Sequence, residues 1–173
     1  MNVDITIREW ESADRNGLIH MCNLIDRTYL SNNLPRPYNE QCAEWWFKTI
    51  NRNEGKNGVY RVILDGNKVI GSISTQKKEG IYCKDAEIGY MLLDEYAGNN
   101  IMTQAVKSIC DISFMQLDII RITGLVYGAN LASSRVLEKN GFDLEGIMRN
   151  AVFKNNSIYN LKIYSRLKEV EYI

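Results

Sequence analysis

Residues 59–75, with the sequence VYRVILDGNKVIGSIST, constrain the fold of this chain more than any other segment. Two runs rich in β-branched residues flank the tripeptide Asp65-Gly66-Asn67. β-Branched side chains favour strands, and a short turn whose glycine supplies a positive φ favours a hairpin. We therefore predict an antiparallel hairpin here and a β-sheet that is antiparallel in its middle.

The other elements follow from hydrophobic periodicity and from capping residues. We predict strands over residues 4–10, 85–93, 120–128, 147–153 and 157–167, and helices over 13–28, from Asn39 onward, over 102–117 and over 130–142. The order is then β-α-α-β-β-β-α-β-α-β-β, which is typical of a mixed α/β domain in three layers. Since no linker or repeat divides the chain, we expect a single domain over residues 1–173.

Composition argues against several classes of function. Lys and Arg number 21, as do Asp and Glu, so the net charge is zero and a nonspecific nucleic-acid or anionic-membrane binder is not expected. One histidine, His20, and four cysteines far apart in sequence disfavour zinc enzymes, metal sites and nucleophile–histidine enzymes. No signal peptide or apolar run of ~18 residues is visible, so we expect a cytoplasmic protein with no metal.

One segment, EIGYMLLDEYAGNNIMTQAV at residues 87–106, combines a strand, a short loop and a helix start. A loop that enters a helix N-terminus offers backbone N–H groups and the positive end of the helix dipole, which suit a phosphate group. Gly98 permits close approach of the backbone, and Asn99 and Asn100 tolerate left-handed conformations. A plain turn before a helix is the alternative interpretation, because the segment is neither a P-loop nor a dinucleotide fingerprint.

Together with NLASSRVLEKNGFDLEG at residues 130–146, this segment resembles the GNAT superfamily of acetyl-CoA-dependent N-acetyltransferases. Within it the chain is most similar to the branch that acetylates the N-terminal residues of ribosomal proteins. The stretches REWESAD (8–14) and IYNLKIYSRL (158–167) follow the same pattern, so the resemblance covers nearly the whole chain. It implies a three-layer GNAT-like acyl-CoA N-acyltransferase fold, with acetyl-CoA as co-substrate and a primary amine as acceptor.

The resemblance also implies where the cofactor lies. The pyrophosphate would contact the loop and helix start, and the pantetheine arm would pair with an open strand edge whose N–H groups also polarise the acetyl carbonyl. The residues concerned are Met91, Leu92 and Leu93 on the strand, Gly98, Asn99, Asn100, Ile101, Met102 and Thr103 in the loop and helix start, and Asn130. The chain departs from the family's usual pattern at Ala97 and Asn100, where a basic or amide side chain and a second glycine are common, and at Asn160, where Asp is common.

Two residues are candidates for catalysis in that framework. Ser133 matches a serine placed to hydrogen-bond the departing sulfur, while Leu137 stands where many relatives carry a tyrosine. Glu87 is the best carboxylate for accepting the amine proton, through water. The alternatives are that Ser133 only begins a helix, that Asn130 only caps it, and that Glu87 is an ordinary strand residue facing solvent.

The acceptor is the most open part of the prediction. We expect the proline-containing loop at residues 31–38 to be mobile without substrate and to help cover the amine site. A protein N-terminal α-amine, for example of a ribosomal protein, is the first expectation. A small amine (a polyamine, an aminoglycoside or an amino acid) is the alternative enzyme substrate, and a catalytically weak acyl-CoA-binding module is the alternative class. The chain is expected to be a monomer or a homodimer.

Overall fold

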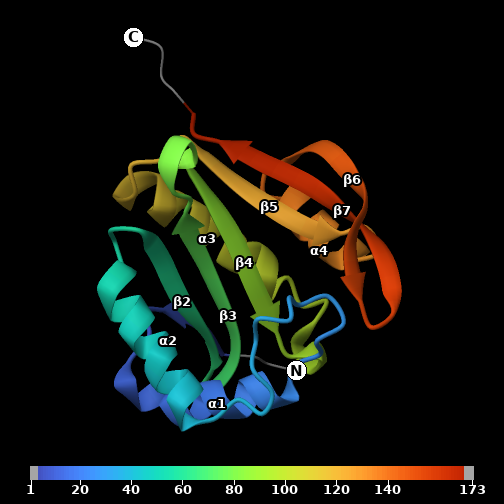
Figure 1. The fold of residues 1–173 in the computed structure, drawn as a ribbon. Helices are drawn as coiled ribbons and strands as arrows, with labels where there is room; N and C mark the ends of the chain where they lie inside the picture. Colours follow the sequence, from blue (N-terminus) through green and yellow to red (C-terminus); the bar gives the residue numbers. More distant parts are fainter. Residues whose placement is uncertain (1–3, 170–173) are drawn as a thin grey trace.

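The computed structural model describes residues 4–169, which form one seven-stranded sheet of order β1-β2-β3-β4-β5-β7-β6 with helices on both faces (Figure 1). The strands are β1 (Ile5–Arg8), β2 (Gly58–Asp65), β3 (Lys68–Lys77), β4 (Asp85–Leu92), β5 (Arg121–Tyr127), β6 (Asp143–Lys154) and β7 (Ser157–Leu167). The α-helices are α1 (Arg15–Leu24), α2 (Glu40–Asn53), α3 (Ile101–Gln116) and α4 (Leu131–Glu138). The predicted order of elements and the α/β class are confirmed. Residues 1–3 and 170–173 of the predicted single domain lie outside the described residues.

The hairpin of β2 and β3 forms as the sequence predicts. Asp65 pairs with Lys68, and Gly66 between them has a φ of +55°. The first helix is shorter than predicted, since α1 ends at Leu24 instead of residue 28. There the carboxylate of Asp26 accepts hydrogen bonds from the N–H and hydroxyl of Thr28, which stabilise a turn in place of helix.

Helices cover the two faces of the sheet unevenly. Figure 1 shows α1 and α2 in front of β2 and β3, whereas α3 and α4 lie behind the sheet. The hydroxyls of Thr75 on β3 and Ser113 on α3 are 2.6 Å apart, and Thr75 is opposite Ile88 on β4, so Ile88 faces α3. Because side chains alternate along a strand, Tyr90 also faces the α3/α4 side and Glu87 faces the other side.

The apolar core fills the space on both sides of the sheet. Burial of these side chains is the main favourable term in folding. The buried residues include Leu18, Met21, Ala43 and Phe47 from α1 and α2, and Ala105, Val106, Ile109 and Phe114 from α3. No helix in residues 4–169 combines the length and apolar character needed to cross a membrane.

The two central strands separate along their length. β4 and β5 are parallel and pair only from Asp85↔Arg121 to Ile88↔Gly124. Beyond that point β4 continues along β3 to Leu92, and β5 continues along β7 to Tyr127. The sheet therefore opens into a gap between β4 and β5, each of which presents one unpaired edge.

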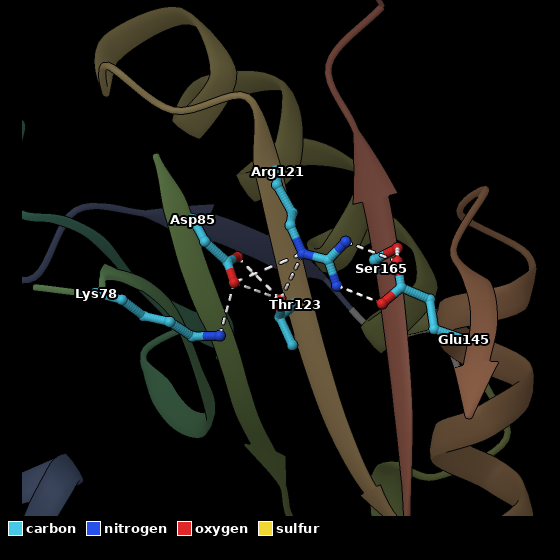
Figure 2. A network of polar contacts seen from close by, with 6 residues as sticks. All are labelled: Lys78, Asp85, Arg121, Thr123, Glu145 and Ser165. Atoms are coloured by element: carbon cyan, nitrogen blue, oxygen red, sulfur yellow. Dashed lines mark hydrogen bonds and ion pairs between the residues drawn. The ribbon is translucent and has the colours of Figure 1, made fainter. Parts of the chain in front are cut away.

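A network of polar side chains joins the strands where β4 and β5 are still paired (Figure 2). The Thr123 hydroxyl donates to the carboxylate of Asp85, and Arg121 makes two 2.6 Å hydrogen bonds to Glu145. Lys78 reaches Asp85 at 2.7 Å and Ser165 donates to Glu145 at 2.6 Å. Since the network spans β4 to β6, it holds together the closed end of the gap.

We predict that this network stabilises the protein in a pH-dependent manner. Hydrogen bonds from Arg121 and Ser165 lower the pKa of Glu145 to about 2, below about 4.3 for an unfolded glutamate. A depressed carboxyl pKa adds stability that is complete above about pH 5 and is lost as the pH falls toward 2. Glu145→Gln should therefore lower the melting temperature by about 2–4 °C at pH 7, because Glu145 is partly exposed and screened.

The check is a series of thermal melts of both proteins between pH 7 and pH 3. The difference between wild type and Glu145→Gln should shrink as the pH falls. A difference that stays constant over this range would show that the carboxylate's charge is not what stabilises the sheet here.

Candidate active site

A cleft of about 660 Å³ passes through the gap between β4 and β5, a volume typical of small-molecule sites. Its walls come from both faces of the sheet. Tyr29 and Glu87 line it on the α1/α2 side, and Ser133 and Arg135 line it on the α3/α4 side. The gap therefore joins an opening on one face of the sheet to an opening on the other.

The open edge of β4 differs from the prediction in one respect. The N–H of Leu93 donates to Ile70 O on the β3 side at 2.9 Å. Because backbone groups alternate along a strand, the N–H of Met91 also faces β3, and the N–H of Leu92 faces the gap. Met91 and Leu92 line the cleft, but Leu93 is buried outside it. The expectation of free N–H groups at Met91 and Leu93 is therefore wrong, and Leu92 is the remaining donor of the three.

The loop before α3 has the backbone that a phosphate site needs. Gly98 has a φ of +80° and Asn100, the N-cap of α3, has a φ of +61°. The N–H groups of the first helical turn, at Ile101, Met102 and Thr103, have no partner within the helix, and all three residues line the cleft.

Asn99 differs from its predicted role. It lies outside the cleft, its φ is not positive, and its side-chain amide donates to the carbonyls of Tyr96 and Ala97 at 3.2 and 3.3 Å. The side chain of Asn99 therefore stabilises the loop, whereas Gly98 and Asn100 line the cleft.

Two basic residues of the cleft were missed by the sequence analysis. Arg135 lies in α4 and Lys139 is the residue at the C-terminal cap of that helix, and both line the cleft on the α3/α4 side. They are four residues apart and so lie on one face of the helix, which is the signal that could have found them. With the N-terminus of α3, they place positive charge on this side of the cleft, whose wall also contains Asp94. They supply the positive charge that the loop at Ala97 lacks.

Ser133 is held at the first turn of α4 by the cap of that helix. The side chain of Asn130 accepts a 3.1 Å hydrogen bond from the N–H of Ser133, so the capping role of Asn130 is present, and both residues line the cleft. The Ser133 hydroxyl is 2.6 Å from the hydroxyl of Tyr90 on β4. Burial raises the pKa of Tyr90 to about 12, so this phenol keeps its proton at neutral pH.

Leu137 belongs to the core of the protein as well as to the wall of the cleft. It is 1% exposed, and a Cβ added to Gly124 would lie 2.7 Å from its side chain. Gly124 therefore lets α4 pack closely on β5. Where many relatives carry a tyrosine, this chain has an apolar contact between helix and sheet.

Glu87 stands across the sheet from Ser133. Its side chain is exposed, lines the cleft, and makes no hydrogen bond or ion pair with other residues in the range 4–169. The predicted base and the predicted sulfur partner thus lie on opposite faces of the sheet and line the same cleft. In the same range, no three His, Cys, Asp or Glu side chains gather in an arrangement suited to a metal ion.

The wall on the α1/α2 side is built differently from the prediction. Of the loop at residues 31–38, only Ser31 lines the cleft, next to Tyr29 and Leu30. The mobility expected of this loop stays a prediction, but two basic side chains bind backbone carbonyls of the loop and of the segment before it, residues 27–30. Arg27 donates to the carbonyls of Leu34 and Pro35 at 2.7 and 3.0 Å.

The second basic side chain is Lys154, at the end of β6. It is 6% exposed, and its ammonium donates to the carbonyls of Arg27, Thr28 and Leu30. Lys154 thereby connects the β6–β7 hairpin to the segment that carries Tyr29 into the cleft. Figure 1 shows this segment beside the C-terminal end of β4.

A GNAT acetyltransferase domain model matches residues 4–143 of the chain. The chain belongs to the GNAT family. Its seven-stranded sheet, with a gap between β4 and β5, is the fold that the sequence resemblance implied, and that prediction is confirmed.

Relatives of this GNAT chain include two curated bacterial proteins. The uncharacterized N-acetyltransferase YoaA of Bacillus subtilis is 34% identical over 50% of the chain and 49% of its own length, so the chain spans about half of YoaA. The ribosomal-protein-serine acetyltransferase of Escherichia coli is 28% identical over 82% of the chain and 81% of its own length. A solved structure of RimL, a ribosomal L7/L12 α-N-protein acetyltransferase in complex with coenzyme A, superposes with a TM-score of 0.79. It has 22% identity and covers 96% of this chain and 95% of the RimL chain.

We predict that Lys154 positions the acceptor side of this GNAT cleft. Lys154→Met leaves three carbonyls without their shared donor, so the segment around Tyr29 should lose its fixed position. The KM for the amine acceptor should rise about 3–30-fold, because placing two substrates together depends on both walls, while the Kd for coenzyme A stays nearly unchanged.

The measurement is steady-state kinetics with each substrate varied, together with calorimetric titration of coenzyme A. Lys168→Met is the matched control, since Lys168 also donates to a carbonyl, that of Phe114, away from the cleft. If the affinity for coenzyme A falls and the KM for the acceptor does not change, Lys154 does not position the acceptor side of the cleft.

Proposed function

We propose that this protein transfers the acetyl group of acetyl-CoA to a primary amine, most specifically the N-terminal α-amine of a protein. The observation that carries the proposal is the single cleft that crosses the sheet. It joins a basic side, made by the start of α3 with Arg135 and Lys139, to an acidic side with Asp26 and Glu87. A polyanionic cofactor suits the first side, and a cationic amine suits the second.

The geometry can meet the requirements of acetyl transfer from a thioester. The amine attacks the acetyl carbon, and the C–S electron pair leaves with sulfur as the intermediate collapses. The N–H of Leu92 faces the gap and is the proposed donor to the carbonyl oxygen. Glu87 is the proposed acceptor of the amine proton through water, and Ser133 is the proposed hydrogen-bond partner of the sulfur. Acetyl-CoA brings the activated acyl group, so holding both substrates in one cleft supplies much of the rate.

The proposed acceptor rests on the relatives and on the shape of the site. A relative named for acetylating a serine of a ribosomal protein aligns with 82% of the chain. Within residues 4–169, Figure 1 shows no helix in front of β4, β5 and β7, on the face where Tyr29 and Glu87 line the cleft. This face therefore leaves room for the chain that follows an N-terminal residue. A free α-amine titrates near pH 7.7–8.0, so a useful fraction is neutral at physiological pH.

The test is release of free thiol from acetyl-CoA with a panel of acceptors. The panel contains peptides beginning with Ser or Ala, the same peptides with blocked N-termini, spermidine and an aminoglycoside. Transfer to free peptides and not to blocked ones supports the proposal, and mass spectrometry locates the acetyl group on the α-amine. Turnover on small amines alone would overturn the proposed acceptor. Coenzyme A binding without turnover on any amine would overturn the activity and favour a binding module.

A further inference from the structure

The hydroxyl of Ser133, the proposed partner of the sulfur, is paired with the hydroxyl of Tyr90, which has no role in the proposed reaction. They are 2.6 Å apart, on β4 and α4, and both residues line the cleft. We infer that Tyr90 is a positioning residue that donates a hydrogen bond to Ser133, turns the Ser133 hydroxyl toward the cleft and so stabilises the thiolate of departing coenzyme A. This inference rests on the proposed function.

Counting protons gives the direction of the hydrogen bond. A serine hydroxyl has one proton and two lone pairs. If Ser133 donated to Tyr90, the phenol proton would be left with the Ser133 carbonyl at 3.4 Å, which is long for an O–H···O hydrogen bond. If Tyr90 donates, the 2.6 Å contact is satisfied and the Ser133 proton is free for the sulfur. The phenol is also the stronger acid of the two groups and therefore the better donor.

Relative acidity decides what the pair can do for the sulfur. A thiol has a pKa of about 8.5, and burial raises the pKa of Tyr90 to about 12. Proton transfer from Tyr90 through Ser133 to the thiolate would therefore be uphill. The pair acts as a chain of hydrogen bonds to a sulfur that keeps its negative charge. The thiolate later takes its proton from solvent, which balances the proton that the amine nitrogen loses.

Two buried titratable groups near the pair stay uncharged at neutral pH. Cys110 of α3 and Tyr164 of β7 lie near Tyr90, and burial raises the pKa of both, that of Cys110 to about 12. The charged residues of the cleft wall are Arg135 and Lys139 on the α3/α4 side and Asp26, Glu87 and Asp94 elsewhere in the wall. Variants of Tyr90 that leave these charges in place isolate the effect of one hydroxyl.

The first experiment measures the pKa of the coenzyme A thiol bound to the protein, from the ultraviolet absorbance of the thiolate. Subtracting the protein's own titration removes the signal of the exposed Cys83. Tyr90→Phe should raise the thiol pKa by roughly 1 unit, about tenfold in the dissociation constant. Ser133→Ala should raise it at least as much, and the double variant no further than Ser133→Ala. Tyr164→Phe is the matched control and should leave it unchanged, because the Tyr164 hydroxyl donates to Glu138.

The second experiment measures kcat with any amine that the wild type acetylates. Tyr90→Phe should lower kcat by about 3–30-fold with little change in the KM for acetyl-CoA, and should have no effect in the Ser133→Ala background. Equal losses in both backgrounds, or a bound thiol with the wild-type pKa in Tyr90→Phe, would overturn the inference. The thiol titration needs no acceptor, so it decides the matter even if no amine is acetylated and the proposed function fails. Absence of coenzyme A binding would overturn both.

Discussion

Ser133→Ala is expected to lower kcat by ~10–1000-fold, the usual scale for losing one donor to a developing charge. The charge on sulfur forms mainly as the tetrahedral intermediate collapses, so the hydroxyl should contribute more to the transition state than to binding. The Kd for acetyl-CoA should therefore change little. Steady-state kinetics and calorimetric titration of the same preparation separate the two quantities.

Ser134→Ala is the matched control for this variant. Ser134 is the next residue of α4, but it is buried and does not line the cleft. Its hydroxyl accepts a 3.3 Å hydrogen bond from the ammonium group of Lys162. It should keep the wild-type kcat once the folded fraction is accounted for. If Ser133→Ala turns over like the wild type, the serine only begins its helix, and the thiolate is stabilised by water or another residue.

Gly98→Val is expected to weaken coenzyme A binding by about 5–100-fold. Gly98 has a φ of +80°, and holding a β-branched residue there costs of order 1–3 kcal/mol. The space beside Gly98 is open, since nothing lies within 4 Å of a Cβ built on it. The loop should therefore relax to another backbone conformation without unfolding the protein. Its N–H groups would then leave the places from which they are proposed to contact the pyrophosphate.

Gly80→Val separates local strain from a general loss of stability. Gly80 has a φ of +63° and the same open space around its Cβ, but it lies outside the cleft wall. Calorimetric titration should show wild-type affinity for Gly80→Val and reduced affinity for Gly98→Val. Unchanged affinity in Gly98→Val would move the pyrophosphate away from this loop.

The basic residues of the cleft lie on a different element from the one that the family's loop pattern implies. The loop at Ala97 carries no basic side chain, but Arg135 and Lys139 line the same cleft from α4. Charge acts over several ångströms, so its source can move from a loop to a neighbouring helix. The backbone donors cannot move in this way, because they need the left-handed conformations of Gly98 and Asn100.

The turns and helix caps that depend only on adjacent residues were determined by the sequence alone. The turn at Gly66, the caps Asn39 and Asn130, and the positive φ of Gly141 all follow from the conformational preferences and local hydrogen bonds of a few adjacent residues. The order of helices and strands follows from periodicity along the chain. These local signals were sufficient for the α/β class, whereas most of the site residues were predicted from the resemblance to the GNAT family.

Only the tertiary structure decided which groups meet. Tyr90 and Ser133 are 43 residues apart, and Lys154 lies more than 120 residues from the carbonyls it holds. Which N–H of β4 faces the gap depends on the register between β4 and β3, and shifting that register by one residue would exchange Leu92 for its neighbours. No local pattern records such contacts, because they arise from how whole elements pack. Glu87, Ser133 and the basic residues Arg135 and Lys139 therefore line one cleft only in the folded chain.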